Sequence, residues 1–376
     1  MTTPAPNPLL ELRKLGESVW LDDISRGMLE DGSLARLIND DGVAGLTSNP
    51  AIFANSIMTD PKYAQPIAKL LPSVSSSMAL YEELALEDLH DAAALLRPLY
   101  DSTAGGDGYI SMEVSPHLAY DTPGSLAEGK RLWQRLKLPN ALIKIPGTEA
   151  GLPVIRDLIA AGINVNVTLL FSPERYRSVA RAYMEGLAAR AAAGAPLASV
   201  ASVASFFLSR IDTAVDKLLD DLSARGQPAA RAMRGKAAIA SACRAYEIHE
   251  ELLSTPQWQA LAANGARPQR LLWASTSAKD PTFSPIKYVE ELVVSGTVNT
   301  MPLETLNAYR RLGRPEQRLE RHIAEGSDAR ESLERLDVDL DAVAVQLEQE
   351  GVAKFIEPFD KLQKWLEERR HRQAVT

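Results

Sequence analysis

Short apolar segments alternate with longer amphipathic segments along the whole chain. Each apolar segment spans about four to six residues and is rich in β-branched side chains, as buried strands are. The longer segments repeat their apolar residues at helical spacing. This alternation is typical of parallel βαβ units. We predict eight strands, at residues 19–22, 43–47, 109–114, 142–145, 165–169, 202–206, 271–274 and 293–298.

One face of each predicted helix carries its apolar residues. Such a helix packs that face on a sheet. The two stripes that illustrate this consist of Tyr176, Val179, Tyr183 and Leu187, and of Ile211, Val215, Leu218 and Leu222.

Three regions fall outside the repeating units. The segment 55–102 is too long for one connection and has a helical stripe, so we predict extra helices after the second strand. Residues 328–372 are predicted to form C-terminal helices, with Gly351 ending one of them. Residues 1–15, which begin with a proline-rich stretch, are predicted to form a flexible tail.

The eight units favour a closed (βα)8 barrel of the TIM type. No internal repeat or low-complexity linker divides residues 1–376, so we predict a single domain. A doubly wound open sheet is the alternative. However, neither a Gly-x-Gly-x-x-Gly motif nor a Walker-type loop follows a strand.

The composition limits the kinds of molecule that the protein could bind. The chain is 45% hydrophobic and 24% charged, as in ordinary globular proteins, and no apolar run approaches the ~18 residues of a membrane span. A formal net charge of -8 argues against nucleic acid or an anionic membrane as the main partner, but not against small anionic substrates. The absence of a signal-peptide pattern and the single Cys243 indicate a cytoplasmic protein without an internal disulfide.

Lys144 stands in the middle of the apolar segment 141–146. Strand side chains alternate between faces, so Lys144 points opposite to Ile143 and Ile145. If the isoleucines pack under helices, the amine enters the other side of the sheet. Desolvation or a cationic neighbour lowers the pKa of an amine, which makes lysine a nucleophile that can form a Schiff base with a ketone. The alternative is a snorkelling or ion-paired lysine near a strand end.

Polar residues late in the predicted strands are the other candidates for chemistry. Functional groups of such barrels collect at the carboxyl ends of the strands. One polar residue there would mean little, but the feature recurs in seven of the eight predicted strands. A lysine with two carboxylates can support imine formation and proton transfer. The candidates are Asp22, Thr47, Ser48, Asn49, Glu113, Lys144, Asn166, Thr168, Ser205 and residues 275–277.

Metal and serine-hydrolase chemistry fit the sequence poorly. The five histidines show no ligand spacing such as His-x-x-x-His, and no Gly-x-Ser-x-Gly elbow is present. We therefore predict an enzyme without a metal or another cofactor.

Two segments resemble the signature segments of the transaldolases, which belong among the Schiff-base aldolases. The match is to the longer bacterial type of transaldolase. Residues 45–53 (Gly-Leu-Thr-Ser-Asn-Pro-Ala-Ile-Phe) lie around the second strand, and residues 142–151 (Leu-Ile-Lys-Ile-Pro-Gly-Thr-Glu-Ala-Gly) surround Lys144. The similarity runs from about Ser18 to Leu366. Other segments that agree are residues 20–26, 113–116, 166–172 and 297–302, and Ser205 with Arg210.

The resemblance implies a (βα)8 barrel and roles for individual residues. Lys144 would attack the C2 carbonyl of a ketose phosphate, and Asp22 would take the C4 hydroxyl proton as the C3–C4 bond breaks. Asp23 is the alternative base, since alternation lets only one of these two aspartates face the lysine. Glu113 and Thr168 would hold a water for proton transfer.

The same resemblance implies the residues that bind substrate. Asn49, Asn166 and Ser205 would bind the hydroxyls of the bound triose, and Arg210 the phosphate. Many family members have a second arginine after the seventh strand, where this chain has residues 273–279 (Trp-Ala-Ser-Thr-Ser-Ala-Lys). Ser275 and Lys279 are therefore the further candidates for phosphate binding.

The implied activity is that of a pentose phosphate pathway transaldolase. It would move dihydroxyacetone from sedoheptulose 7-phosphate to glyceraldehyde 3-phosphate, giving erythrose 4-phosphate and fructose 6-phosphate. One alternative is an aldolase that uses the same lysine and releases free dihydroxyacetone. The other is a regulatory protein that binds sugar phosphates on an inactive barrel. The sequence does not predict the oligomeric state.

Overall fold

The computed structural model describes residues 7–374. Seven parallel strands form one curved sheet in the order β1-β7-β6-β5-β4-β3-β2. The part of the predicted tail at residues 1–6 lies outside the described residues. The strands are β1 (Ser18–Leu21), β2 (Ile110–Glu113), β3 (Ala141–Pro146), β4 (Val165–Leu170), β5 (Ser202–Phe207), β6 (Arg270–Ala274) and β7 (Val298–Met301).

Residues 43–47 close the sheet between β1 and β2. Leu46 forms a parallel bridge with Leu21, and Gly45 forms one with Tyr109. The Leu21 N–H donates to the Gly45 carbonyl at 3.0 Å, and the Leu46 N–H donates to the Tyr109 carbonyl at 2.8 Å. This segment is therefore the short eighth member of the ring, and the predicted barrel is confirmed.

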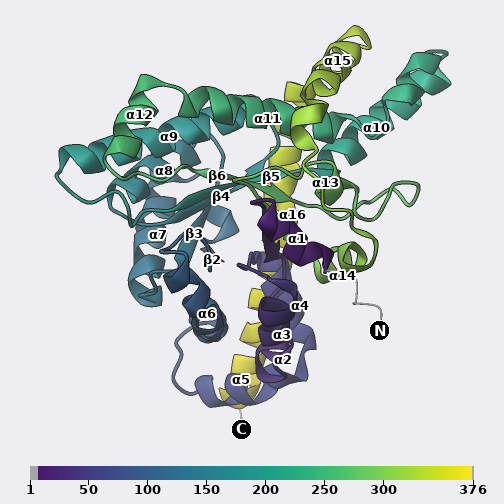
Figure 1. The fold of residues 1–376 in the computed structure, drawn as a ribbon. Helices are drawn as coiled ribbons and strands as arrows, with labels where there is room; N and C mark the ends of the chain where they lie inside the picture. The colour runs from purple at the N-terminus through teal and green to yellow at the C-terminus, as the bar shows by residue number, and fades with distance from the viewer. Residues whose placement is uncertain (1–6, 375–376) are drawn as a thin grey trace, which may run out of the picture.

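Helices pack around the outside of the sheet (Figure 1). Ile143 faces them, because a Cβ added to Gly129 of α7 would lie 3.5 Å from the Ile143 side chain. Alternation then turns Lys144 into the barrel, as predicted. The helices that follow β2 through β7 are α7 (Thr122–Leu136), α8 (Gly151–Ala160), α9 (Pro173–Ala192), α10 (Ser209–Ala224), α11 (Ala237–Leu253), α12 (Pro256–Ala263), α13 (Lys287–Glu290) and α14 (Leu303–Leu312).

Burial confirms most of the predicted stripes. All four members of the α9 stripe are buried. The predicted stripe of α10 (Ser209–Ala224) was wrong at one position, because Leu218 is 41% exposed and Leu219 is buried instead. Leu219 is four residues beyond Val215, which keeps it on the same helix face.

The predicted extra helices are present and form the lower part of the molecule in Figure 1. They lie in the region between residues 43–47 and β2, where α6 carries the predicted buried stripe. The bounds of this group are α4 (Pro50–Thr59), α5 (Ala64–Leu70) and α6 (Ser77–Ser102), and the two helices before it are α2 (Arg26–Glu30) and α3 (Ser33–Asp41).

The C-terminal region consists of α15 (His322–Arg335) and one long helix, α16 (Leu340–Ala374). Asp339 precedes α16, and its carboxylate accepts hydrogen bonds from the N–H groups of Asp341 and Ala342 at 3.0 and 2.9 Å. These bonds satisfy donors that the first turn of a helix leaves unpaired.

The prediction that Gly351 ends a helix was wrong, because α16 continues through it. A Cβ added at Gly351 would lie 3.0 Å from Leu169 Cδ2 and 3.6 Å from Arg210 Nη1. The glycine therefore serves a close approach between α16 and the barrel rather than a helix end.

Two further predictions were wrong. The last strand begins at Val298 rather than at residue 293, because Gly296 has a φ of 84°, which interrupts the extended backbone. Residues 8–14 form α1 (Pro8–Lys14) instead of a flexible tail. The fully buried Leu9 and Leu12 attach this helix to the core.

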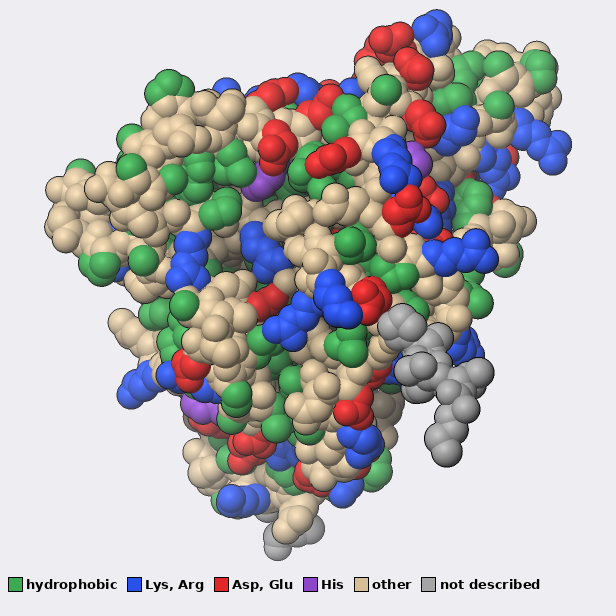
Figure 2. Space-filling model, in the orientation of Figure 1, with side chains coloured by type: hydrophobic (Ala, Val, Ile, Leu, Met, Phe, Trp, Pro, Cys, Tyr) green, Lys and Arg blue, Asp and Glu red, His purple; other side chains and the backbone are tan. Residues whose placement is uncertain are grey.

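The outer surface carries charges of both signs. Figure 2 shows lysine and arginine side chains interspersed with acidic ones on the face drawn there. Within residues 7–374, no helix has the length and apolar character needed to cross a membrane.

Glu17, just before β1, is a fully buried carboxyl group. It accepts a hydrogen bond from the Val294 N–H at 3.2 Å. Burial raises the pKa of Glu17 from its ordinary value of 4.5 to about 8, because the charged form loses its hydration. The folded chain thus holds a proton that the unfolded chain releases above pH 4.5. The stabilisation is complete below that pH and is lost as the pH rises through about 8.

We expect Glu17→Gln to remove this pH dependence, because the amide stays neutral at every pH. Relative to the parent, the melting temperature of the variant should rise by roughly 2 °C or more between about pH 5 and about pH 9. Thermal unfolding followed by circular dichroism measures this difference. Glu304→Gln, at an exposed position of α14, is the control. A constant difference between Glu17→Gln and the parent would contradict the assignment.

Candidate active site

Three of the predicted site residues lie side by side across neighbouring strands. The strand register pairs Glu113 of β2 with Lys144 of β3, and Lys144 with Asn166 of β4. All three side chains are buried. Register therefore places the amine between a carboxyl group and an amide inside the barrel.

Lys144 is only 3% exposed. Its Nζ donates a hydrogen bond to the Ser48 carbonyl at 2.8 Å and lies 3.3 Å from Glu113 Oε2. The ring of Phe355, from α16, has its centroid 5.8 Å from Nζ. The ion pair considered as the alternative for Lys144 is thus present, but deep in the barrel, where the carboxyl group can also exchange a proton with the amine.

Glu113 titrates near neutrality. The pKa of Glu113 is raised from 4.5 to about 7, mainly because the carboxyl group is buried. The nearby Lys144 opposes this rise, and the charge of Asp22 adds to it. A carboxyl group with this pKa can both accept and donate protons at physiological pH.

Thr168 lies two residues beyond Asn166 in β4, so their side chains share the inner face. Thr168 is fully buried. Its hydroxyl has no hydrogen-bond partner within residues 7–374. Because buried hydroxyls are normally paired, this one is suited to bind a water or a ligand.

A chain of hydrogen bonds fixes the amide of Asn166. Ser205 Oγ donates to Asn166 Oδ1 at 2.8 Å, and Asn166 Nδ2 donates to Ser111 Oγ at 3.0 Å. All three residues are buried. Ser111 was not among the residues predicted from the sequence, although its place two residues before Glu113 puts both on one face of β2.

Asp22 follows β1 and is held by a hydroxyl pair. Thr47 Oγ1 donates to Asp22 Oδ1 at 2.6 Å and lies 2.7 Å from Thr300 Oγ1. The charge of Asp22 influences the pKa values of both Glu113 and Arg210. Asp22 is thus the aspartate that lies among the other candidates. For Asp23, burial and the charge of Asp22 raise the pKa.

Asn49 caps helix α4. Its Oδ1 accepts hydrogen bonds from the N–H groups of Ala51 and Ile52 at 2.9 and 3.0 Å. The capping bonds occupy the amide oxygen and fix the orientation of the side chain. Nδ2 is the group that remains for a ligand.

Arg210 lies in the first turn of α10. Its guanidinium is 5.4 Å from the ring centroid of Phe207, and its Nη1 is buried without a hydrogen-bond acceptor among the described residues. Burial lowers the pKa of Arg210, and the carboxylates of Asp22 and Glu350 oppose that shift. A half-buried guanidinium with an unused donor is a suitable group for an oxyanion.

The structure separates the two candidates for further phosphate binding. Ser275 Oγ lies 2.8 Å from the Oγ of Ser209, the neighbour of Arg210. Lys279 is exposed, donates to Ser277 Oγ at 2.6 Å and lines a separate pocket of about 260 Å³ that contains none of the other candidates. Ser275 therefore lies against the residue that precedes Arg210, whereas Lys279 lines a pocket that Arg210 does not line.

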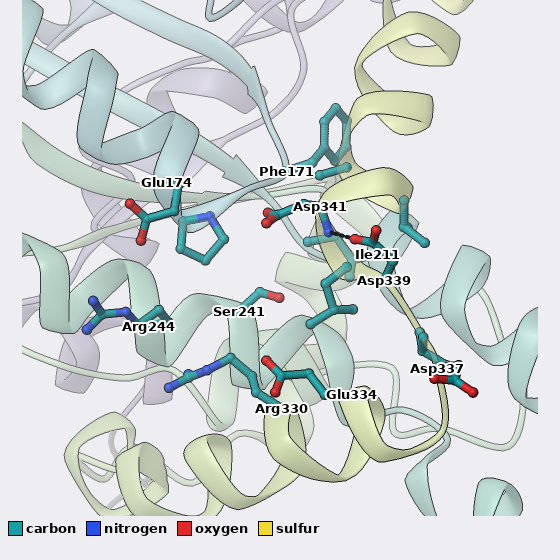
Figure 3. Close-up of a pocket in the computed structure, with 15 residues that line it drawn as sticks. Phe171, Glu174, Ile211, Ser241, Arg244, Arg330, Glu334, Asp337, Asp339 and Asp341 are labelled. Atoms are coloured by element: carbon teal, nitrogen blue, oxygen red, sulfur yellow. Dashed lines mark hydrogen bonds between the residues drawn. The ribbon is translucent and has the colours of Figure 1, made fainter.

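A pocket of about 530 Å³ lies beside the first turns of α16. Figure 3 shows Phe171 on its upper side and Arg244, Arg330 and Glu334 on its lower side. None of the predicted site residues line this pocket. The candidate site is instead the buried group inside the barrel.

Comparison with known proteins shows to which family the chain belongs. The family model for transaldolase/fructose-6-phosphate aldolase matches residues 19–366. The chain is 48% identical over 345 residues to a transaldolase of Thiobacillus denitrificans, covering 92% of this chain and 95% of the relative. It is 43% identical over 371 residues to transaldolase 2 of a Nostoc species, covering 96% and 97% of the two chains. The chain therefore belongs to the transaldolase/fructose-6-phosphate aldolase family.

Proposed function

We propose that the protein is a transaldolase that carries a three-carbon unit on Lys144. The observation that carries this proposal is the buried row of Glu113, Lys144 and Asn166 across three strands. It combines a nucleophile, a proton carrier and a hydroxyl-binding amide. Several curated relatives of nearly full length are named transaldolases, and this supports the same activity here.

The first step is imine formation on the amine of Lys144. Glu113 Oε2, 3.3 Å away, accepts a proton from the ammonium, and the neutral amine attacks the C2 carbonyl of a ketose phosphate. The carbinolamine then loses water, which leaves the protonated imine. Glu113 and the Thr168 hydroxyl, which has no other partner in the described chain, hold the water that relays these protons.

The second step breaks the C3–C4 bond. Asp22 removes the proton of the C4 hydroxyl, the aldose phosphate leaves, and the electron pair of the broken bond moves into the imine as an enamine. Thr47, with its 2.6 Å hydrogen bond, orients the Asp22 carboxylate. Addition of the enamine to an aldehyde acceptor reverses these steps and releases the product ketose.

The remaining residues bind the substrate. The Asn49 amide nitrogen donates a hydrogen bond to a triose hydroxyl, and Asn166 and Ser205 form further hydrogen bonds with the triose hydroxyls. Arg210 binds the phosphate with Ser275 beside it. Lys279 is the weaker candidate for this role, because it is exposed in a separate pocket.

The proposed substrates are sedoheptulose 7-phosphate and glyceraldehyde 3-phosphate of the pentose phosphate pathway. The mechanism as derived needs no cofactor. We also propose a cytoplasmic location, which the single, buried Cys243 supports because disulfides are rare there.

An aldolase that releases free dihydroxyacetone is the second candidate, since the family name includes an aldolase. The transaldolase names of the relatives favour transfer. An inactive sugar-phosphate-binding protein is less compatible with the site, because a binder has no need of a buried lysine beside a carboxyl group of pKa about 7.

We expect Lys144→Ala to abolish turnover while binding of the phosphate survives, because Arg210 remains in place. The loss should be at least about 1000-fold in kcat, as is typical when a covalent nucleophile is removed. A coupled assay with fructose 6-phosphate and erythrose 4-phosphate measures turnover, and calorimetry with inorganic phosphate measures binding. Lys130→Ala, at an exposed position of α7, provides the control for loss of a lysine. Normal turnover in Lys144→Ala would refute the mechanism.

We also expect kcat/KM, which reports the groups of the free enzyme, to fall as the pH drops below about 7. The pKa of Glu113 is about 7, so acid converts its carboxylate to the protonated form, which cannot accept the proton of the Lys144 ammonium. In Glu113→Gln this fall at low pH should be absent, and the remaining activity should be low at every pH. Glu331→Gln, at an exposed position of α15, should keep the parent profile. If the fall at low pH persists unchanged in Glu113→Gln, a group other than Glu113 causes it.

A further inference from the structure

One face of α16 lies against the candidate active site. Gly351, Phe355 and Phe359 recur every four residues and thus share that face. Gly351 approaches Leu169 and Arg210, and the ring of Phe355 is 5.8 Å from the amine of Lys144. The site is therefore covered by a helix that begins far beyond the last strand in sequence.

The position of Phe355 is fixed by its surroundings. Its side chain is 4% exposed. One turn further along α16, Phe359 packs edge-on against Tyr81 of α6, with ring centroids 5.6 Å apart. Near the helix end, Arg370 donates a hydrogen bond to the Ser75 carbonyl at 2.8 Å. The inserted helices thus hold α16 in place, and with it the ring over the amine.

The ring of Phe355 also lies within cation–π range of the charge on the lysine, at 5.8 Å. An aromatic face within about 6 Å of a cation attracts it, by roughly 0.5–2 kcal/mol. A protonated imine on Lys144 would carry its charge in the same place. The ring has no atom that could donate a proton to the bound triose, unlike a water molecule in its position.

We propose that Phe355 is a specificity-determining residue that keeps bulk water away from the enamine on Lys144. This inference rests on the proposed Schiff-base function. In this position the ring shields the carbon that must wait for an aldehyde. Phe355 thereby favours transfer over release of free dihydroxyacetone.

The two outcomes differ at C3 of the enamine. In transfer, C3 attacks the carbonyl carbon of an aldehyde, forms a new C–C bond, and the aldehyde oxygen takes up a proton. In release, C3 takes a proton from water, and the resulting imine adds water at C2. The C–N bond then breaks, which returns the amine of Lys144 and frees dihydroxyacetone. Excluding water from C3 suppresses the second outcome only.

The test is the ratio of free dihydroxyacetone formed to ketose formed by transfer, with fructose 6-phosphate as donor and erythrose 4-phosphate as acceptor. Phe355→Ala should raise this ratio at least about 10-fold, because the smaller side chain admits water. Phe355→Leu retains apolar bulk and should give a smaller rise. Val345→Ala removes apolar bulk from an exposed position of the same helix, and it should leave the ratio unchanged.

Each outcome either supports or contradicts the proposed role of Phe355. An unchanged ratio in folded Phe355→Ala, or an equal rise in Val345→Ala, would overturn it. If Phe355→Ala does not fold, Phe355→Leu decides by the same ratio. Borohydride trapping of the parent with fructose 6-phosphate tests the Schiff base separately. A trapped triose on Lys144 with an unchanged ratio would reject only the role of Phe355, whereas no trapped triose would reject the proposed function itself.

Discussion

The burial of Lys144 beside Glu113 is the interaction on which the rest of the site depends. Taking two charges out of water costs several kcal/mol for each, and mutual attraction repays this only with good geometry. Here the strand register sets that geometry, since β2 and β3 pair these two residues directly. The Ser48 carbonyl provides a further acceptor for the amine. Loss of either partner would leave an uncompensated charge in the barrel.

The same burial allows Glu113 and Lys144 to exchange protons. Burial raises the pKa of Glu113 to about 7, so the carboxyl group can return any proton that it takes. The barrel supplies the other groups from different strands: Asp22 after β1, Asn166 and Thr168 from β4, and Ser205 from β5. The extra helices and α16 then enclose the arrangement, which separates it from bulk solvent.

The strand pattern and the inner face of the barrel could be predicted from the sequence, because alternation places Lys144 opposite to two isoleucines and puts Asn166 with Thr168. The pairing of Glu113 with Lys144 could not be derived from spacing, since register depends on contacts between distant segments. The role of Gly351 was missed for a similar reason. A glycine that ends a helix and one that permits close packing look alike in sequence, and only the partner helix or barrel distinguishes them.

The most direct test of the covalent mechanism is borohydride reduction in the presence of fructose 6-phosphate, followed by intact and peptide mass spectrometry. Borohydride converts an imine into a stable amine. We expect one reduced triose per chain, on the peptide that contains Lys144. No adduct on folded protein, or an adduct on a different lysine, would contradict it.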